Sequence, residues 1–170
     1  MEFDFKLLFS PFNLKGLLLK NRIVMPPMTT NFAAEDGSVT DRMVDYYEAR
    51  ARGGAAHIVV EAACIEPAGK LMAFSPGIWD DGKIPGFRRI ADACHKHGAK
   101  AALQIAHAGR QTTPLFTGEP TRGVSPLADP LTGELPIELT QDDIHNLLDR
   151  FRNAARRAVE AGFDAIEIHM

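Results

Sequence analysis

Three polar side chains lie in or just beyond an apolar run at residues 101–110, namely Gln104, His107 and Arg110. The run follows Gly98 and has the length and composition of a strand that is buried on both faces. A buried amide without a hydrogen-bond partner costs about 1–3 kcal/mol, so Gln104 needs a partner. A neighbouring backbone group or a bound ligand with amide-like edges would meet that need.

His107 and Arg110 fall at the carboxyl end of this predicted strand, where parallel α/β proteins place their chemistry. The structural alternative is a core glutamine that is satisfied within the protein and a histidine in an ordinary loop. Arg110 likewise either binds a phosphate or carboxylate of a ligand, or forms a structural salt bridge.

Two further apolar runs end in polar residues. Residues 57–64 carry one charge, Glu61, toward their carboxyl end. We interpret Glu61 as a buried carboxylate that fixes a neighbouring loop, with a catalytic role as the alternative. Residues 163–170 carry His169 at the corresponding place. Strand ends of this kind are where function is sought in a parallel sheet.

The elements that would position these residues follow one repeated pattern, which is a helix, a glycine, an apolar strand and a polar strand end. A first helix is predicted from its N-cap Thr40 to Gly53. A second helix is predicted from apolar residues that recur at helical spacing through residues 87–94. A third is predicted from Thr140, which with Asp143 resembles a capping box that has Asp in place of Glu. The glycines that close the three helices are Gly54, Gly98 and Gly162.

Before the first repeat, apolar residues at 7–19 predict a β-hairpin that turns near Lys15 and Gly16. Residues 22–25 predict a strand that ends at Pro26, because two successive prolines cannot continue a central strand. The segment at 65–83 is predicted as a long loop, and loops of that length in a compact domain are usually functional. The segment at 111–139 is predicted as another long loop, which its five prolines make stiff rather than disordered.

Alternating strands and helices predict βαβ units and a parallel sheet. Because crossovers are right-handed, all carboxyl ends of the strands would lie on one edge. Short connections before the strands and long loops after them are typical of a parallel (β/α)8 TIM barrel, which needs about 250 residues and eight strands. We therefore expect residues 1–170 to form the amino-terminal half of one barrel domain, with the hairpin, about four strands and three helices. The first and fourth strands would be open edges.

Composition narrows the function classes. Of 170 residues, 45% are hydrophobic and 24% charged, with a formal net charge of −3. Such a chain favours neither nucleic-acid binding nor a membrane span, and acidic residues near the start argue against a secretory signal. Cys64 and Cys94 have no metal-ligand or disulfide spacing, so we expect two free buried thiols, no metal site and a cytoplasmic location.

The motifs become specific when they are considered together. They include LFSP at residues 8–11, LKNRIVMPPM at 19–28, IVVEA at 58–62, GIWDD at 77–81, QIAHAGR at 104–110 and AGFDAIEIH at 161–169. In this order they resemble the old yellow enzyme family of FMN-dependent NAD(P)H:flavin oxidoreductases and ene-reductases. The branch that they resemble is that of the 2,4-dienoyl-CoA reductases and bacterial enoate reductases.

The resemblance implies a set of FMN contacts. Pro27, Met28 and Thr29 match the family's loop at the flavin ring, with Thr29 where a Thr or Cys tunes the flavin. Ala62 matches a position whose backbone meets the isoalloxazine. Gln104 matches the amide that binds the pyrimidine edge of the flavin, and a primary amide offers the donor and the acceptor that this edge requires.

His169 matches the first of two donors that hold the carbonyl oxygen of the substrate, and it also lies at the cofactor. The resemblance implies NAD(P)H as the reductant and a small enone or enoate as the substrate. The second donor, the phosphate site and any iron–sulfur cysteines would follow Met170, so an iron–sulfur cluster is undecided. We expect the chain alone to be inactive. The alternative function is a non-catalytic half-barrel that self-associates, pairs with another chain or acts as a binding module.

Overall fold

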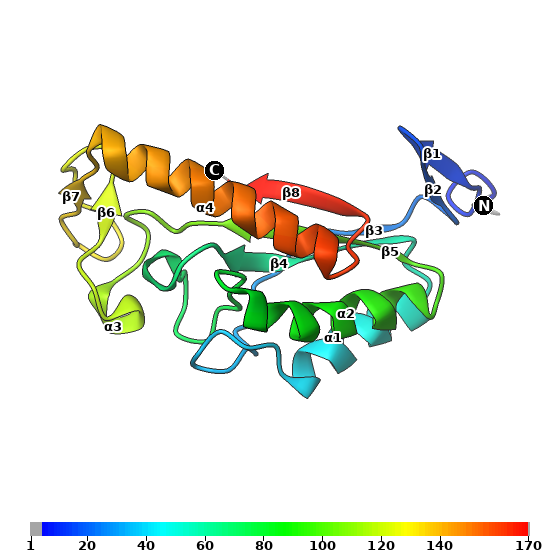
Figure 1. The fold of residues 1–170 in the computed structure, drawn as a ribbon. Helices are drawn as coiled ribbons and strands as arrows, with labels where there is room; N and C mark the ends of the chain where they lie inside the picture. The colour runs from blue at the N-terminus through cyan, green and yellow to red at the C-terminus, as the bar shows by residue number, and fades with distance from the viewer. Residues whose placement is uncertain (1–4, 170) are drawn as a thin grey trace.

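The computed structural model describes residues 5–169 of the chain, and its centre is a four-stranded parallel sheet. The strands stand in the order β3-β4-β5-β8 (Figure 1). Their bounds are Val24–Met25 for β3, His57–Cys64 for β4, Lys100–Ala106 for β5 and Ala165–His169 for β8. The four predicted strands are therefore confirmed, although the first is only two residues long.

Three long helices cover one face of this sheet. They are α1 (Asp41–Arg52), α2 (Ile84–His95) and α4 (Gln141–Glu160). One apolar core joins them to the strands, with Met43, Phe87 and Ala154 from the helices packed around Leu103. Doubly wound folds carry helices on both faces of their sheet, whereas a (β/α)8 barrel carries them only outside. The arrangement is that of part of a barrel.

The helix ends follow the local sequence. The Thr40 hydroxyl accepts a hydrogen bond from the Met43 amide at the start of α1. At the start of α4, Thr140 and Asp143 form the predicted capping box, in which each side chain accepts from the backbone N–H of the other residue. These caps satisfy amides that have no partner inside the helix, so the expected helix starts are confirmed.

The hairpin and the long loops hold smaller elements. The strands β1 (Phe12–Leu14) and β2 (Leu17–Leu19) form the predicted antiparallel hairpin. The expectation of three helices is corrected by a short fourth one, α3 (Pro114–Thr117), which begins at a proline. The segment at 111–139, predicted as a long loop, also holds a small parallel pair of strands, β6 (Arg122–Gly123) and β7 (Ile137–Glu138). Two 3-10 turns, η1 (Pro67–Gly69) and η2 (Asp81–Lys83), follow β4.

Side chains of β5 alternate between the two faces of the sheet. Leu103 and Ile105 belong to the core under the helices, so Gln104 between them points to the opposite, helix-free face. In β8 the register pairs Gln104 with Glu167 and Ala106 with His169. These four residues therefore share the helix-free face, which would be the interior of a barrel.

A bulge in β4 changes which of its side chains reach that face. Val60 pairs with Leu103, and Ala63 pairs with Ile105, so Glu61 and Ala62 together lie opposite Gln104 alone. The side chain of Glu61 reaches Tyr47 of α1 and therefore lies on the helix side. Ala62 is left on the helix-free side.

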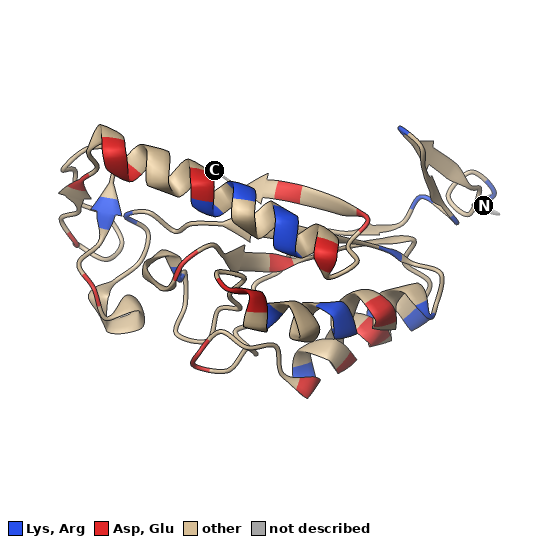
Figure 2. Cartoon of the chain, in the orientation of Figure 1, with Lys and Arg blue, Asp and Glu red and all other residues tan. Residues whose placement is uncertain are grey.

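Charged residues lie mainly on the helices and loops, and each of β4 and β8 carries one acidic position (Figure 2). In sequence these are Glu61 and Glu167. β3 and β8 each have one strand neighbour, so both are edges, as expected. Within residues 5–169, no helix combines the length and the apolar character that crossing a bilayer requires.

Candidate functional site

The carboxyl ends of β4, β5 and β8 meet on the helix-free face. There Ala62, Ala106 and His169 border one cavity of about 120 Å³. Its remaining lining residues, which come from the same strand ends and the loops that follow them, are Cys64, Gly69, Leu71, His107, Ala108 and Gln111. Small side chains dominate this lining, and small side chains leave room for a ligand to lie close to the backbone.

Gln104 lies on the same face, two residues before Ala106 in β5, and is 7% exposed. Its Nε2 donates a 2.6 Å hydrogen bond to Oε1 of Glu167 on β8. The partner of Gln104 is therefore a carboxylate on the neighbouring strand. The sequence led us to expect a backbone group or a bound ligand instead. Within residues 5–169 the bond uses one of the two N–H donors of the amide, and the carbonyl oxygen of Gln104 accepts from no side chain or loop amide.

The loop after β3 is fixed to β4 by Glu61. The carboxylate of Glu61 accepts hydrogen bonds from the Thr30 amide at 2.8 Å and from the Thr30 hydroxyl at 2.6 Å. Glu61 is buried and hydrogen-bonded to the neighbouring loop, as our interpretation of it expects. Because Thr29 precedes Thr30 and Ala62 follows Glu61, the same contact brings these two predicted FMN contacts to one edge of the sheet. Met28 is 56% exposed beside them, with Pro27 half-buried.

The loops after the strands are bonded to one another. The Phe74 amide donates to the Asn31 side chain at 2.9 Å, which joins the first loop to the second. The Ala108 amide donates to the Gly69 carbonyl at 3.1 Å, which joins the second loop to the third. The edge that carries the predicted contacts is thus built from three mutually supported loops.

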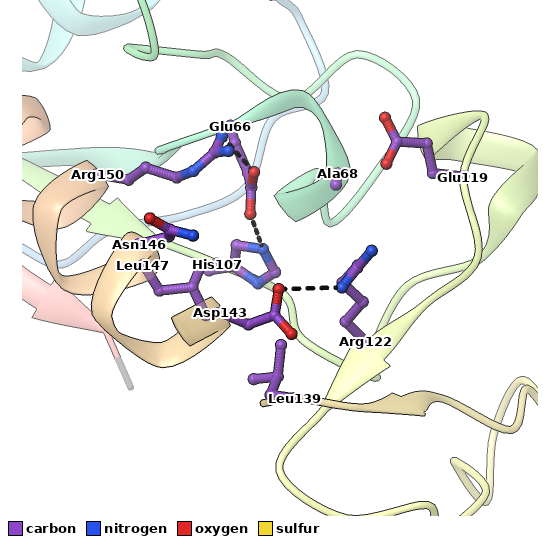
Figure 3. Close-up of a pocket in the computed structure, with 10 residues that line it drawn as sticks. All are labelled: Glu66, Ala68, His107, Glu119, Arg122, Leu139, Asp143, Asn146, Leu147 and Arg150. Carbon is purple, nitrogen blue, oxygen red and sulfur yellow. Dashed lines mark hydrogen bonds and ion pairs between the residues drawn. The ribbon is translucent and has the colours of Figure 1, made fainter. Parts of the chain in front are cut away.

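His107 connects the second and third loops to α4. Its Nε2 lies 2.9 Å from Oε1 of Glu66, and Glu66 also forms an ion pair with Arg150 (Figure 3). Nδ1 accepts a 2.9 Å hydrogen bond from the Gly109 amide, so the neutral imidazole carries its proton on Nε2 and donates it to Glu66. The hydrogen bond with His107 is the main reason that the pKa of Glu66 lies below its usual range.

The pocket around this network, about 170 Å³, is polar, and several of the charged side chains that line it are paired with one another (Figure 3). Arg122 pairs with Asp143 at 3.3 Å, and the carboxylate of Glu66 is shared by two partners. His107 is therefore a loop histidine with a structural role, the alternative that the sequence left open. Arg110 donates to the Leu127 carbonyl at 3.2 Å, and no salt bridge of Arg110 is found within residues 5–169.

A larger cavity of about 470 Å³ opens beside His169. Its apolar wall comes from α4 and from the segment between α3 and α4, and consists of Val124, Leu127, Leu139, Leu147 and Phe151. The sequence did not single out any of these residues. The sequence described the 111–139 segment only as a long, stiff loop that follows a strand, which is the kind of segment that carries function in a (β/α)8 barrel.

Several titratable groups lie away from this edge. His95 and Lys100 both contact the Asp164 carboxylate, at 2.7 Å and 2.9 Å, below the amino end of the sheet. Cys64 and Cys94 are free and buried, and burial raises the pKa of the Cys64 thiol to about 11. Within residues 5–169, no three His, Cys, Asp or Glu side chains are grouped as a metal site requires.

Comparison with known proteins shows which family and which relatives this chain is similar to. Residues 7–170 match the model of the NADH:flavin oxidoreductase / NADH oxidase family. The chain is 47% identical over 164 residues to an NADH oxidase of Thermoanaerobacter brockii, covering 95% of this chain and 25% of that protein. It is 45% identical over 160 residues to an NADH:acrylate oxidoreductase of Vibrio harveyi, covering 91% of this chain and 15% of the relative.

The fold is that of solved old yellow enzymes. The old yellow enzyme homologue of Zymomonas mobilis superposes with a TM-score of 0.85 at 32% identity, over 95% of this chain and 48% of that one. The chain thus spans about half of that TIM barrel and a smaller share of the two longer relatives. The resemblance and the barrel fold expected from the sequence are confirmed, and the chain belongs to the NADH:flavin oxidoreductase / NADH oxidase family.

Proposed function

We propose that this chain supplies the flavin-facing half of an FMN-dependent enzyme that passes hydride from NAD(P)H to an activated C=C bond of an enone or enoate. The observation that carries the proposal is the placement of Ala62, Gln104 and His169 on one face, at the carboxyl ends of three adjacent parallel strands. In barrels this edge holds the active site.

The residues present fit a flavin. The pyrimidine edge of the flavin alternates hydrogen-bond acceptors with a donor, and the Gln104 amide is buried beneath the cavity with an acceptor and a second donor free among the described residues. Ala62 and Ala106 leave space above it. Thr29 would donate its hydroxyl to the ring, while Pro27 and Met28 would border it.

The bound FMN supplies the hydride chemistry, which belongs to the cofactor. The chain's own contribution is to bind and orient. His169 lies at the end of β8 and borders both the small-residue cavity and the larger apolar one. An imidazole there would donate a hydrogen bond to the carbonyl oxygen of the substrate and stabilise the negative charge that develops on it.

We infer that turnover requires the rest of the barrel. The second donor to the substrate and the phosphate site of FMN are expected outside these strands, so the chain alone should hold FMN weakly and be inactive. The open edge of β8 would pair with the remaining strands. The free, buried Cys64 and Cys94 favour the cytoplasm, where thiols stay reduced.

A non-catalytic half-barrel that self-associates is the second candidate. It is favoured by the apolar surface near the open edge, where Ile168 is 58% exposed on β8, and Leu148 and Val159 are 56% and 64% exposed on α4. Exposed apolar side chains beside an unpaired strand favour association.

Visible absorption separates the two candidates. We expect the purified chain, titrated with FMN, to quench flavin fluorescence and shift the flavin bands near about 370 and 450 nm, which the cofactor itself sets. A longer polypeptide with the complete barrel should retain FMN through gel filtration. If neither polypeptide takes up FMN and the chain elutes as a dimer, the second candidate replaces the first.

A further inference from the structure

Glu61 stands at the centre of a network that joins three segments far apart in the chain. It accepts from Thr30, as described above, and its Oε1 also accepts from the Tyr47 hydroxyl at 3.1 Å. The Tyr47 oxygen in turn accepts from the Glu61 amide at 2.9 Å. Strand β4, helix α1 and the loop after β3 are thus bonded to one carboxylate.

This carboxylate is buried without a cation. Glu61 is 1% exposed, and none of the ion pairs among residues 5–169 involves it. Every group that faces its oxygens is a donor, because the Thr30 hydroxyl already accepts from the Phe32 amide and the Tyr47 hydroxyl from Glu61 itself. The ionised carboxylate, which only accepts, satisfies all three donors, whereas an amide satisfies at most part of them.

The bulge in β4 determines which sides of the sheet Glu61 and Ala62 face. It turns Glu61 to the helix side and leaves the next residue, Ala62, on the cavity. The Thr30 end of the network is joined directly to Thr29. One side chain therefore sets the spacing between two backbone segments that would meet the flavin from different strands.

We propose that Glu61 is a positioning residue that holds the segment at residues 27–30 against the end of β4, in the place where it would contact the flavin. The part of this inference that concerns FMN rests on the proposed function. Glu61 itself lies on the helix side of the sheet, so it acts through Thr30 and not by contact with the cavity.

Three variants of the full chain test the proposal. Glu61→Gln keeps the shape but places an amide N–H₂ opposite a Thr30 donor. Thr30→Val removes the hydroxyl, which donates to Glu61 and accepts from the Phe32 amide, and leaves the bond from the Thr30 amide to Glu61. Leu103→Ala is the matched control, since it destabilises the core from a neighbouring strand and removes none of the hydrogen bonds of the network. The measurements are amide hydrogen exchange by NMR and FMN affinity by fluorescence titration, at a temperature where all variants remain folded.

We expect Glu61→Gln to speed exchange of the Thr30 amide about tenfold or more relative to amides of β5, and to weaken FMN binding by a similar factor. Thr30→Val should change both in the same direction by less. Leu103→Ala should lower stability and leave both local quantities unchanged. Unchanged Thr30 exchange in Glu61→Gln, or equal loss of FMN affinity in Glu61→Gln and Leu103→Ala, overturns the positioning role.

The two proposals fail separately. If the unmodified chain and the longer polypeptide bind no FMN, the proposed function is wrong. The exchange of the Thr30 amide still decides in that case whether Glu61 holds the segment.

Discussion

Leu103 and Gln104 are neighbours in β5, yet they face two differently built sides of the sheet. Leu103 points into a closed apolar core with Phe87, Ile90 and Met43, all 0% exposed. Gln104 points to a face where the other side chains are small or polar and no helix packs. The first face supplies the stability of the chain, because apolar burial is the main favourable term in folding.

The helix-free face contributes much less apolar burial. Alanines replace the large residues that would fill it, and one buried amide is paired with one carboxylate. A protein keeps such a face when something else is to occupy it. If stability and ligand binding divide between the two faces as this arrangement indicates, substitutions on the two faces should have different effects.

The largest effect is expected on the helix side. Leu103→Ala should lower the free energy of unfolding by about 2–5 kcal/mol, since it leaves a cavity in a closed core. Gln104→Ala, one residue away, should cost less than about 2 kcal/mol, because it removes one hydrogen bond to a charged group. Urea denaturation of both variants measures the difference, and equal losses would contradict the division between the faces.

His169→Ala tests the chemistry of the helix-free face in a longer polypeptide that carries the complete barrel. We expect the rate of enone reduction to fall about 10²–10³-fold, the loss seen when one oxyanion donor is removed. Flavin reduction by nicotinamide should change far less. Stopped-flow measurement of the two half-reactions separates them, and a similar loss in both would exclude the proposed contact with the substrate oxygen.

Gln104→Ala in the same longer polypeptide should weaken FMN retention about tenfold while the barrel stays folded. The fraction of flavin that remains after gel filtration, with circular dichroism as the control for folding, measures the effect. Unchanged flavin occupancy would remove the role proposed for this amide.

The acid dependence of stability should reflect the loops around His107. The pKa of Glu66 is lowered mainly by its hydrogen bond with His107, with burial opposing and Arg150 adding to the effect. The stabilisation is therefore complete above the unfolded pKa of about 4.3 and is lost as the pH falls through the lower folded pKa. Glu66→Gln should reduce stability at pH 7 and flatten its fall in acid. The exposed Glu138→Gln is the control for loss of one carboxylate, and an acid profile identical to the wild type in Glu66→Gln would contradict the assignment.

The smallest effect is expected at the open edge. Ile168 pairs in register with Ile105 on the same face, but Ile105 is 0% exposed and Ile168 58%. Ile168→Ala should lower the free energy of unfolding of this chain by less than about 1 kcal/mol, whereas Ile105→Ala should lower it by about 2–5 kcal/mol. Thermal unfolding of the two variants measures the ratio. In the longer polypeptide the cost at Ile168 should rise, since added strands would cover it.

Much of the fold could be predicted from local sequence. The caps at Thr40 and Thr140 and the glycines after each helix act within a few residues, so the starts and ends of α1 and α4 followed from short-range chemistry. The strand β4 matched its predicted bounds because its apolar run is unbroken except at Glu61. Alternation of such elements is enough to predict a parallel sheet.

The site was less predictable because it depends on pairing between distant segments. The bond from Gln104 to Glu167 requires the register of β5 against β8, and the role of His107 requires the second loop and α4 to meet it. Nothing in the spacing of these residues fixes that register. The small strands β6 and β7 could not be predicted either, because strands of two residues are too short to show a periodic pattern.

The bulge at Glu61 and Ala62 has a consequence for how this strand can change over time. Loss of the codon for Ala62 would restore a regular alternation of side chains and turn the Glu61 carboxylate into the cavity, and loss of the codon for Glu61 would remove the carboxylate that holds the loop. Insertions and deletions are therefore far more disruptive at this point than substitutions, and chains that share the same edge should vary here in side chain but not in length.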